Sequence, residues 1–171
     1  AGSENRTRGR IYQRIGVLAE AVCTLGLTKP CENPSVLSVL PLGGLGEIGK
    51  NCMALVDGHK AILIDCGVSF GGRDFGIDVV HPLFQSLEDL ELCGLVVTHG
   101  HEDHIGAIPY LLERFDIPIF GPKYALELIS ARSHEHEMLR HARMTVTTPR
   151  QAFNIGSFRI EPIAVDHSIP D

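Results

Sequence analysis

Three histidines and an aspartate lie within six consecutive residues in the middle of the chain, at His99, His101, Asp103 and His104. His99 and His101 are two residues apart, so in extended backbone their rings point to the same side. Imidazole and carboxylate groups without a thiolate are typical ligands of Zn²⁺ or Mn²⁺, and they argue against an iron–sulfur cluster or a zinc finger. The spacing therefore predicts a site for divalent metal ions.

Four ligand groups in so short a segment cannot all face one ion, which favours two ions. His99 and His101 would bind the first, and Asp103 and His104 the second. A water shared by two cations about 3.5–4 Å apart loses its proton near neutral pH and becomes a nucleophile. Further ligands must come from distant parts of the sequence. His167 is the candidate, because it follows an expected strand and opens a turn.

The elements that must position these residues alternate between strands and helices. Apolar runs and turn signals predict a mixed α/β domain, with the histidine motif between a buried strand and a helix. The predicted strands are Val36–Leu40, Asn51–Val56, Ala61–Ile64, Leu95–Thr98, Ile117–Phe120, Met144–Thr148, Ala152–Asn154 and Ser157–Val165, and the predicted helices are Pro82–Leu90, Ile108–Phe115 and Tyr124–Leu139.

Composition limits the class of protein. A chain of 171 residues that is 44% hydrophobic and 21% charged predicts one domain with a substantial core. The five cysteines form no C-x-x-C pair, which favours a reducing compartment over a disulfide scaffold. No apolar stretch is long enough to cross a bilayer, so we expect no membrane partner.

Residues 1–34 differ from the rest. They contain an arginine-rich start and an apolar stripe at helical spacing, which predict an accessory helix or the remnant of an organelle-targeting segment. We favour the accessory helix, and take residues 1–34 as an extension and 35–171 as the main domain. Because residues 1–34 carry five basic and three acidic side chains, the remainder has a net charge of −8. A segment with this negative charge attracts a polyphosphate poorly unless bound cations supply the attraction.

Four strings of sequence carry a resemblance to a known family. The H-x-H-x-D-H signature is that of the metallo-β-lactamase fold, and the longer strings resemble the ribonuclease J family, β-CASP-type nucleases of bacteria and plastids. The resemblance runs from about Val36 to Asp171. Its strings are Leu40–Asn51, Leu63–Gly67, Thr98–Leu112 and His167–Asp171.

The resemblance implies the first half of a metallo-β-lactamase-type αββα sandwich, with two divalent ions and an RNA substrate. Zinc is the first choice of metal, and manganese or magnesium are the alternatives. It implies 5′-to-3′ exonuclease and endonuclease activity in RNA decay and ribosomal RNA maturation. The expected location is the cytoplasm of a bacterium, or an organelle if residues 1–34 are a targeting remnant. The full-length protein could form a homo-oligomer.

Individual roles follow from the same resemblance. One metal would be held by three histidines and the other by an aspartate and a histidine. Asp103 would also be the catalytic carboxylate, and Asp65 would orient ligands without touching a metal. The residues of the first metal are His99, His101 and His167, and those of the second are Asp103 and His104.

Other readings stay open. The family needs a bridging aspartate, a final histidine and a β-CASP domain that would all follow Asp171, and Asp166 stands where we expect threonine. We therefore expect the isolated chain to have little or no activity. The alternatives are a superfamily hydrolase acting on a thioester, lactone or lactam, and a non-catalytic scaffold that binds metal or RNA.

Two further segments are interpreted as structural. The cluster His134–His141 lacks the order of a zinc protease motif, so we expect a solvated helix surface. The loop Gly43–Gly49 lacks the Lys-Ser/Thr of a phosphate-binding loop. We expect it to form a tight turn that brings Glu47 and Lys50 near the edge of the site.

Overall fold

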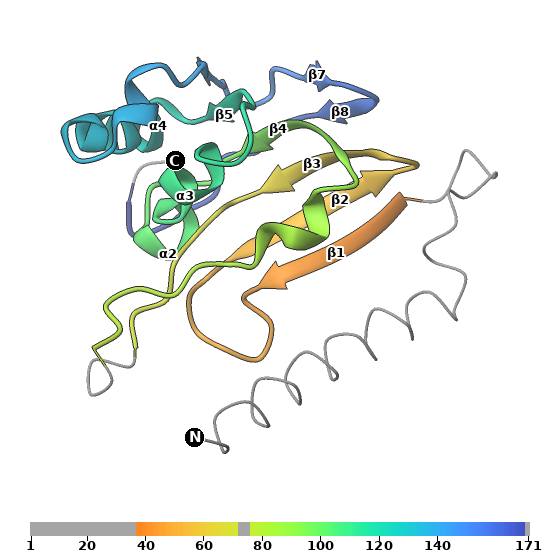
Figure 1. Ribbon diagram of the computed structural model, residues 1–171. Helices are drawn as coiled ribbons and strands as arrows, with labels where there is room; N and C mark the ends of the chain where they lie inside the picture. The colour runs from red at the N-terminus through yellow and green to blue at the C-terminus, as the bar shows by residue number, and fades with distance from the viewer. Residues whose placement is uncertain (1–36, 72–75, 170–171) are drawn as a thin grey trace, which may run out of the picture. The chain divides into compact units, whose positions relative to one another are not determined.

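The computed structural model describes residues 37–71 and 76–169 of the chain, which Figure 1 shows in colour. The helix predicted within residues 1–34 lies outside the described residues, as do its two interpretations. The last two residues of the predicted turn His167–Asp171 also lie outside them.

A six-stranded mixed sheet forms the centre of the fold, and its strands lie side by side in chain order (Figure 1). The first three strands pair antiparallel, while β3, β4, β5 and β6 run parallel. The antiparallel pair β2–β3 needs only a tight turn at Gly58, whereas each parallel pair needs a crossover. The strands are β1 (Leu37–Gly43), β2 (Cys52–Asp57), β3 (Lys60–Ile64), β4 (Glu91–Val96), β5 (Ile119–Gly121) and β6 (Met144–Val146).

Helices and turns supplied by the crossovers pack on one face of the sheet. The main hydrophobic core lies between them and the sheet, and it includes the fully buried Leu63, Leu95, Ile108 and Ile119. None of the helices in the described part is long and apolar enough to cross a membrane. The helices are α2 (Glu102–Ile105), α3 (Ile108–Leu112) and α4 (Lys123–Ala131), and the 3-10 turns are η2 (Phe84–Leu87), η3 (Arg132–His134) and η4 (Glu137–Arg140).

A two-stranded hairpin covers part of the opposite face. Its strands β7 (Phe153–Ile155) and β8 (Phe158–Ile160) pair antiparallel and contribute Ile155 and Phe158 to a second core around the fully buried Ile62. The sheet therefore has apolar packing on both faces. This arrangement agrees with the predicted mixed α/β class and with the first half of a layered sandwich.

Two predicted elements are longer than the observed ones. The long strand predicted at Ser157–Val165 ends at Ile160, since Pro162 lacks the N–H that a paired strand would need. His167 consequently does not follow a strand. The helix predicted for Tyr124–Leu139 is α-helical only to Ala131, because residues 132–137 are all polar and offer no apolar face to bury.

The other differences are smaller. The helix predicted at Pro82–Leu90 is the single 3-10 turn η2. Strand β4 begins at Glu91 and ends at Val96, so it lies earlier than the predicted Leu95–Thr98. The remaining predicted strands and the helix α3 match the observed elements to within a few residues.

Candidate metal centre

The histidine motif lies where the chain leaves the sheet after β4 and enters α2. Val97 still bonds to β5 through its N–H and the Phe120 carbonyl, at 2.7 Å. His101 then adopts extended backbone at the start of α2, and its carbonyl accepts the N–H groups of His104 and Ile105. The predicted placement between strand and helix is therefore observed, with Asp103 and His104 inside the first turn of α2.

Three imidazole rings converge at this point. The Nδ1 atom of His101 lies 2.9 Å from Nε2 of His99 and 3.2 Å from Nε2 of His167, which is 66 residues later in the chain. The ligand atoms of the three all lie within 4.8 Å of one another. Because each nitrogen bound to one zinc ion lies about 2.0–2.1 Å from it, ligand nitrogens must be this close together. The three histidines thus fit one divalent cation.

The opposite nitrogens of these rings have partners of their own. His99 Nδ1 lies 2.9 Å from the hydroxyl oxygen of Thr98, and His101 Nε2 lies 3.4 Å from that of Ser168. Histidines that bind metals almost always donate their other N–H to a neighbour, which fixes the tautomer and the ring. With a cation bound, such partners on the outer nitrogens would let the converging nitrogens of His99 and His101 face it.

Asp65 lies behind the histidines and receives three hydrogen bonds. The Thr98 N–H donates to its Oδ1 at 2.8 Å, and the Thr98 hydroxyl and His104 Nδ1 donate to its Oδ2 at 2.8 and 2.7 Å. The residue is only 5% exposed and has a φ of 57°, a left-handed conformation that aspartate tolerates better than most residues. Its position at the end of β3 therefore lets it orient the motif without facing the three converging nitrogens.

The electrostatic surroundings shift the pKa values of two histidines in opposite directions. Burial lowers the pKa of His104, but its hydrogen bond to Asp65 and the charges of Asp65 and Asp103 outweigh burial, so the pKa is raised from 6.5. For His99, burial lowers the pKa, and the charges of His104 and His167 lower it further. His99 is therefore neutral at neutral pH, as a metal ligand must be.

A second pair of ligand atoms lies beside the three histidines. Asp103 Oδ2 and His104 Nε2 are 3.6 Å apart, and the side-chain amide of Asn51 lies 2.9 Å from the first and 3.1 Å from the second. Asn51 is itself held by its backbone N–H, which donates to the Asp103 carbonyl. The ring centroids of His99 and His104 are 4.1 Å apart, so the two groups of ligands adjoin.

A close backbone approach holds α2 against the end of β3. Cys66 N–H donates to the His104 carbonyl at 2.7 Å, and Gly67 lies directly against the Asp103 carbonyl. A Cβ atom at position 67 would overlap with that carbonyl, so only glycine fits. This contact fixes the start of α2 relative to Asp65.

Sequence reasoning missed Thr98 and Asn51 as parts of the site. Each is a polar residue beside an apolar strand and stands at an end of one of the strings that carry the resemblance, but neither signal names a hydrogen-bond partner. The expected turn at Gly43–Gly49 is present, with positive φ at Gly44, Gly46 and Gly49, but Glu47 and Lys50 pair with each other at 3.1 Å.

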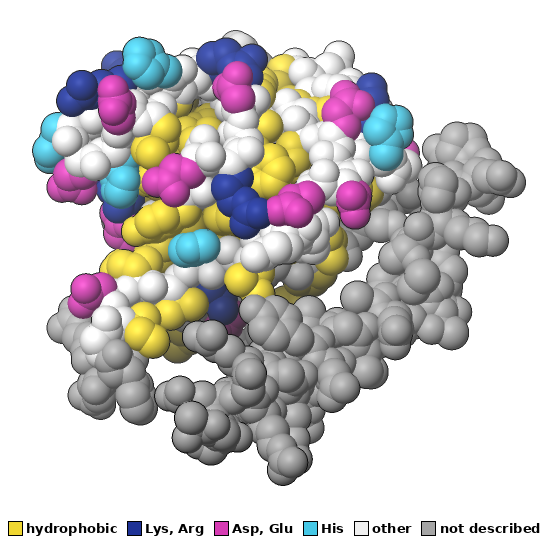
Figure 2. Space-filling model, viewed as in Figure 1, with side chains coloured by type: hydrophobic (Ala, Val, Ile, Leu, Met, Phe, Trp, Pro, Cys, Tyr) yellow, Lys and Arg dark blue, Asp and Glu magenta, His cyan; other side chains and the backbone are white. Residues whose placement is uncertain are grey.

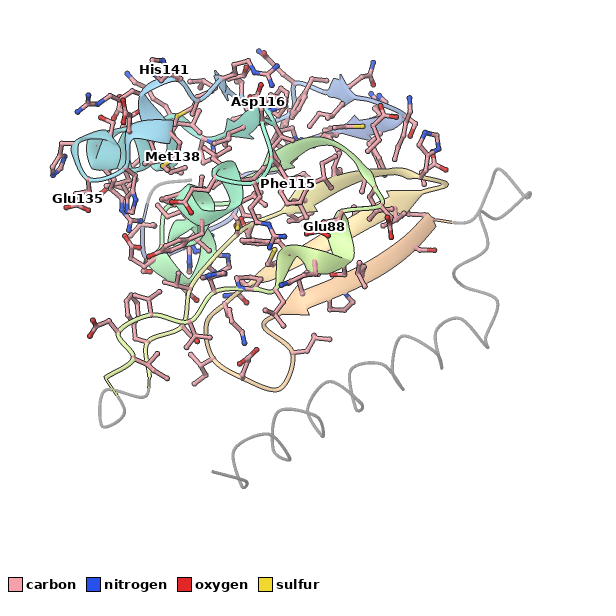
Figure 3. The ribbon with its side chains drawn as sticks, viewed as in Figure 1. Glu88, Phe115, Asp116, Glu135, Met138 and His141 are labelled. Carbon is pink, nitrogen blue, oxygen red and sulfur yellow. The ribbon has the colours of Figure 1, made fainter. Side chains whose placement is uncertain are left out.

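The second histidine cluster does not form a metal site. His134 and Glu135 are exposed and pair at 3.4 Å, and Figure 3 shows Glu135 and His141 well separated on the turns after α4. Within residues 37–71 and 76–169, the one group of three metal-ligating side chains is His99, His101 and His167. The exposed surface predicted for this segment is therefore observed, although on 3-10 turns rather than a helix.

The sequence is similar to curated proteins named ribonuclease J. It is 42% identical over 141 residues to that of *Mycolicibacterium smegmatis* and 43% identical over 140 residues to that of *Synechocystis* sp.. These alignments cover 80% and 79% of this chain, but only 25% and 22% of the relatives. The chain thus spans about a quarter of the length of the curated relatives it matches.

Solved structures and a family model agree with the fold. The structure matches the metallo-β-lactamase fold protein YhfI from *Bacillus subtilis* with a TM-score of 0.55 at 19% identity, over 80% of this chain and 56% of that one. The family model of the metallo-beta-lactamase superfamily matches residues 45–167, which include the whole histidine motif and His167. By this match and by its fold, the chain belongs to the metallo-β-lactamase superfamily.

Proposed function

We propose that this chain is the metal-binding N-terminal part of a ribonuclease that hydrolyses RNA phosphodiester bonds. The observation that carries the proposal is the convergence of His167 with His99 and His101 across 66 residues. The similarity to ribonuclease J over four-fifths of the chain supports RNA as the substrate. Because RNA decay and ribosomal RNA maturation are cytoplasmic processes in bacteria, we also place the proposed activity there.

The roles of the residues follow from their positions. His99, His101 and His167 would hold one divalent cation, zinc by preference, and Asp103 and His104 would contribute to a second. When bound, such cations lower the pKa of a coordinated water and offset the charge of a phosphodiester. Asp65 holds His104 through its Nδ1 atom, which leaves Nε2 directed toward Asp103. Asp103, whose Oδ2 lies 3.6 Å from His104 Nε2, would also act in catalysis.

The charge of the surface supports a need for cations. Residues 35–171 carry a net charge of −8, and Figure 2 shows lysine and arginine interspersed with acidic side chains on the viewed face. A substrate with one negative charge per nucleotide gains little from such a surface. Cations at the histidine centre would supply positive charge where the scissile phosphate must lie.

Cation binding by the chain is the first test. Isothermal titration with Zn²⁺ and with Mn²⁺ should show tight binding to the wild-type chain and at least a tenfold weaker first site in His101→Ala. His141→Ala removes an exposed histidine outside the centre and is the matched control, which should bind as the wild type does. Absence of binding to the wild-type chain would contradict the proposal.

The substrate requires a separate test, because the chain spans a fraction of its relatives. Residues 37–169 can replace the matching segment of the *Mycolicibacterium smegmatis* ribonuclease J. The chimera should cleave a 5′-labelled RNA, the His101→Ala chimera should not, and neither should hydrolyse a thioester or a β-lactam. Hydrolysis of the thioester or lactam in place of RNA would favour the other superfamily activities.

A further inference from the structure

The hydroxyl of Thr98 connects Asp65 to His99. It lies 2.8 Å from Asp65 Oδ2 and 2.9 Å from His99 Nδ1. Thr98 as a whole is exposed, but the two groups that it joins are only 5% and 9% exposed. The hydroxyl therefore bridges two nearly buried side chains at the edge of the centre.

The direction of these hydrogen bonds determines the tautomer of His99. A hydroxyl has one hydrogen, and an ionised carboxylate can only accept, so Thr98 donates to Asp65. The same hydroxyl must then accept from His99, which places the ring proton on Nδ1. Nε2 of His99, the atom that lies 2.9 Å from His101 Nδ1, is thereby left with its lone pair.

Asp65 thus acts on both groups of ligands. It holds His104 directly through Nδ1 and His99 indirectly through Thr98, and in both rings Nε2 is the nitrogen left with its lone pair. The two connections can be tested separately. The backbone N–H of Thr98 donates to the other carboxylate oxygen of Asp65, so it still holds Asp65 when the side chain is changed. A substitution of the Thr98 side chain therefore removes only the connection from Asp65 to His99.

We propose that Thr98 is a positioning residue that fixes the Nδ1–H tautomer of His99 and so prepares the three-histidine centre for a divalent cation. The inference rests on the proposed function for the role of that centre, but its central claim concerns a hydrogen bond of the protein itself. Thr98 acts through His99 and does not contact the cation.

The first measurement is the tautomer of His99 in the full chain, in chelator-treated buffer near pH 7.5. Long-range ¹H–¹⁵N correlation spectra distinguish Nδ1–H from Nε2–H rings, and a His99→Gln variant assigns the signal. The wild type should show Nδ1–H, and Thr98→Val should lose this preference. A wild-type His99 in the Nε2–H form would overturn the proposal whether or not any variant folds.

The second measurement is the affinity for Zn²⁺ by titration calorimetry. Removing a partner that orients a metal ligand weakens affinity about 10–100-fold, and we expect the lower end because Thr98 is exposed. Thr98→Ser keeps the hydroxyl and should restore affinity. Thr145→Val makes the same change at an exposed position of β6 and should leave affinity unchanged. Equal affinities in Thr98→Val and wild type would overturn the proposal.

The two proposals fail separately. The tautomer is measured without metal or RNA, so it tests Thr98 even if the chimera cleaves no RNA. RNA cleavage by the chimera, in turn, tests the substrate and does not report the tautomer of His99 in the metal-free chain.

Discussion

At the level of single residues, Asp65 connects Thr98 and His104 beside the proposed metal centre. Its buried carboxylate receives the N–H and hydroxyl of Thr98 and the Nδ1–H of His104. A buried carboxylate with several donors is held in one orientation, and so is the His104 ring that donates to it. The His99 ring is held indirectly, because its Nδ1 lies 2.9 Å from the Thr98 hydroxyl oxygen.

Replacing Asp65 by asparagine should lower the pKa of His104. The hydrogen bond to Asp65 and its charge are the main effects that raise this pKa, while burial lowers it. Without the carboxylate charge, burial should dominate and bring the pKa toward or below 6.5. NMR titration of the ring protons in chelator-treated protein measures this. Asp116→Asn, at an exposed side chain, is the control, and an unchanged pKa in Asp65→Asn would contradict the interpretation.

The direction of the His104 pKa shift determines how its pairing with Asp65 changes stability with pH. The pKa of His104 is higher in the folded than in the unfolded chain, so the pair contributes stability that is complete below about pH 6.5. That contribution is lost as the pH rises through the raised pKa. The difference in unfolding free energy between wild type and Asp65→Asn should therefore shrink from pH 5.5 to pH 8.5. A difference that grows with pH would show the opposite linkage.

At the level of elements, the site depends on backbone hydrogen bonds that hold the first turn of α2. Cys66, just after β3, donates its N–H to the His104 carbonyl, and Asn51, just before β2, donates its N–H to the Asp103 carbonyl. Gly67 allows this approach, because a side chain there would overlap with the Asp103 carbonyl. The position of α2 is thus set by a glycine rather than by side-chain packing alone.

Gly67→Ala should be costly for both stability and the metal centre. An added Cβ must displace α2, and overpacking of this kind costs about 1–3 kcal/mol of unfolding free energy. Gly71→Ala is the matched control, since nothing lies within 4 Å of its added Cβ, and it should change stability by less than about 0.5 kcal/mol. Urea unfolding measures both variants. Equal unfolding free energies of Gly67→Ala and Gly71→Ala would show that α2 can shift to accommodate the added Cβ without loss of stability.

At the level of the whole molecule, the last described residues return to the site after the hairpin β7–β8. His167 lies beside His99 and His101 although no strand carries it there. Residues 161–167 are largely exposed and have no regular structure. A cation bound by all three histidines would therefore fasten this segment to the motif.

Zn²⁺ should stabilise the folded chain through His167. A ligand that binds only the folded state at 100 times its Kd adds about 2.7 kcal/mol to the unfolding free energy. His167→Ala should lose much of this gain, whereas His141→Ala should keep it. Thermal unfolding with Zn²⁺ and with chelator measures the difference. A full gain in His167→Ala would exclude His167 as a ligand.

Cys66 links the core to the pH dependence of stability. Burial, then the hydrogen bond and charge of the neighbouring Cys52 and the charge of Asp65, raise the pKa of the Cys66 thiol well above 9.0. The folded chain keeps this proton where the unfolded chain releases it, so stability should fall as the pH rises above about 9. Cys66→Ala should flatten this fall between pH 8 and 10 in urea unfolding. If the unfolding free energy of Cys66→Ala fell as steeply with pH as that of the wild type, the fall would come from other groups.

The sequence by itself determined the type of chemistry and most of the elements. Alternation of apolar runs with turn signals locates β2, β3 and α3, because strand and helix periods are local properties of the chain. The composition and two-residue spacing of His99 and His101 indicate a metal ligand pair for the same reason. The predictions of a long helix after Tyr124 and of a strand beyond Ile160 were wrong. Where these elements end depends on packing against other parts of the chain, which local periodicity does not report.

Only the tertiary structure decided which residues complete the centre. The approach of His167 depends on the path of the whole chain, and the roles of Thr98 and Asn51 depend on hydrogen bonds across 33 and 52 residues. Such hydrogen-bond partners are determined by distances in the folded structure, and these distances cannot be derived from the spacing of residues along the chain. The proposed ligands can thus be named from their residue types, whereas the groups that hold these side chains in place could be found only from the fold.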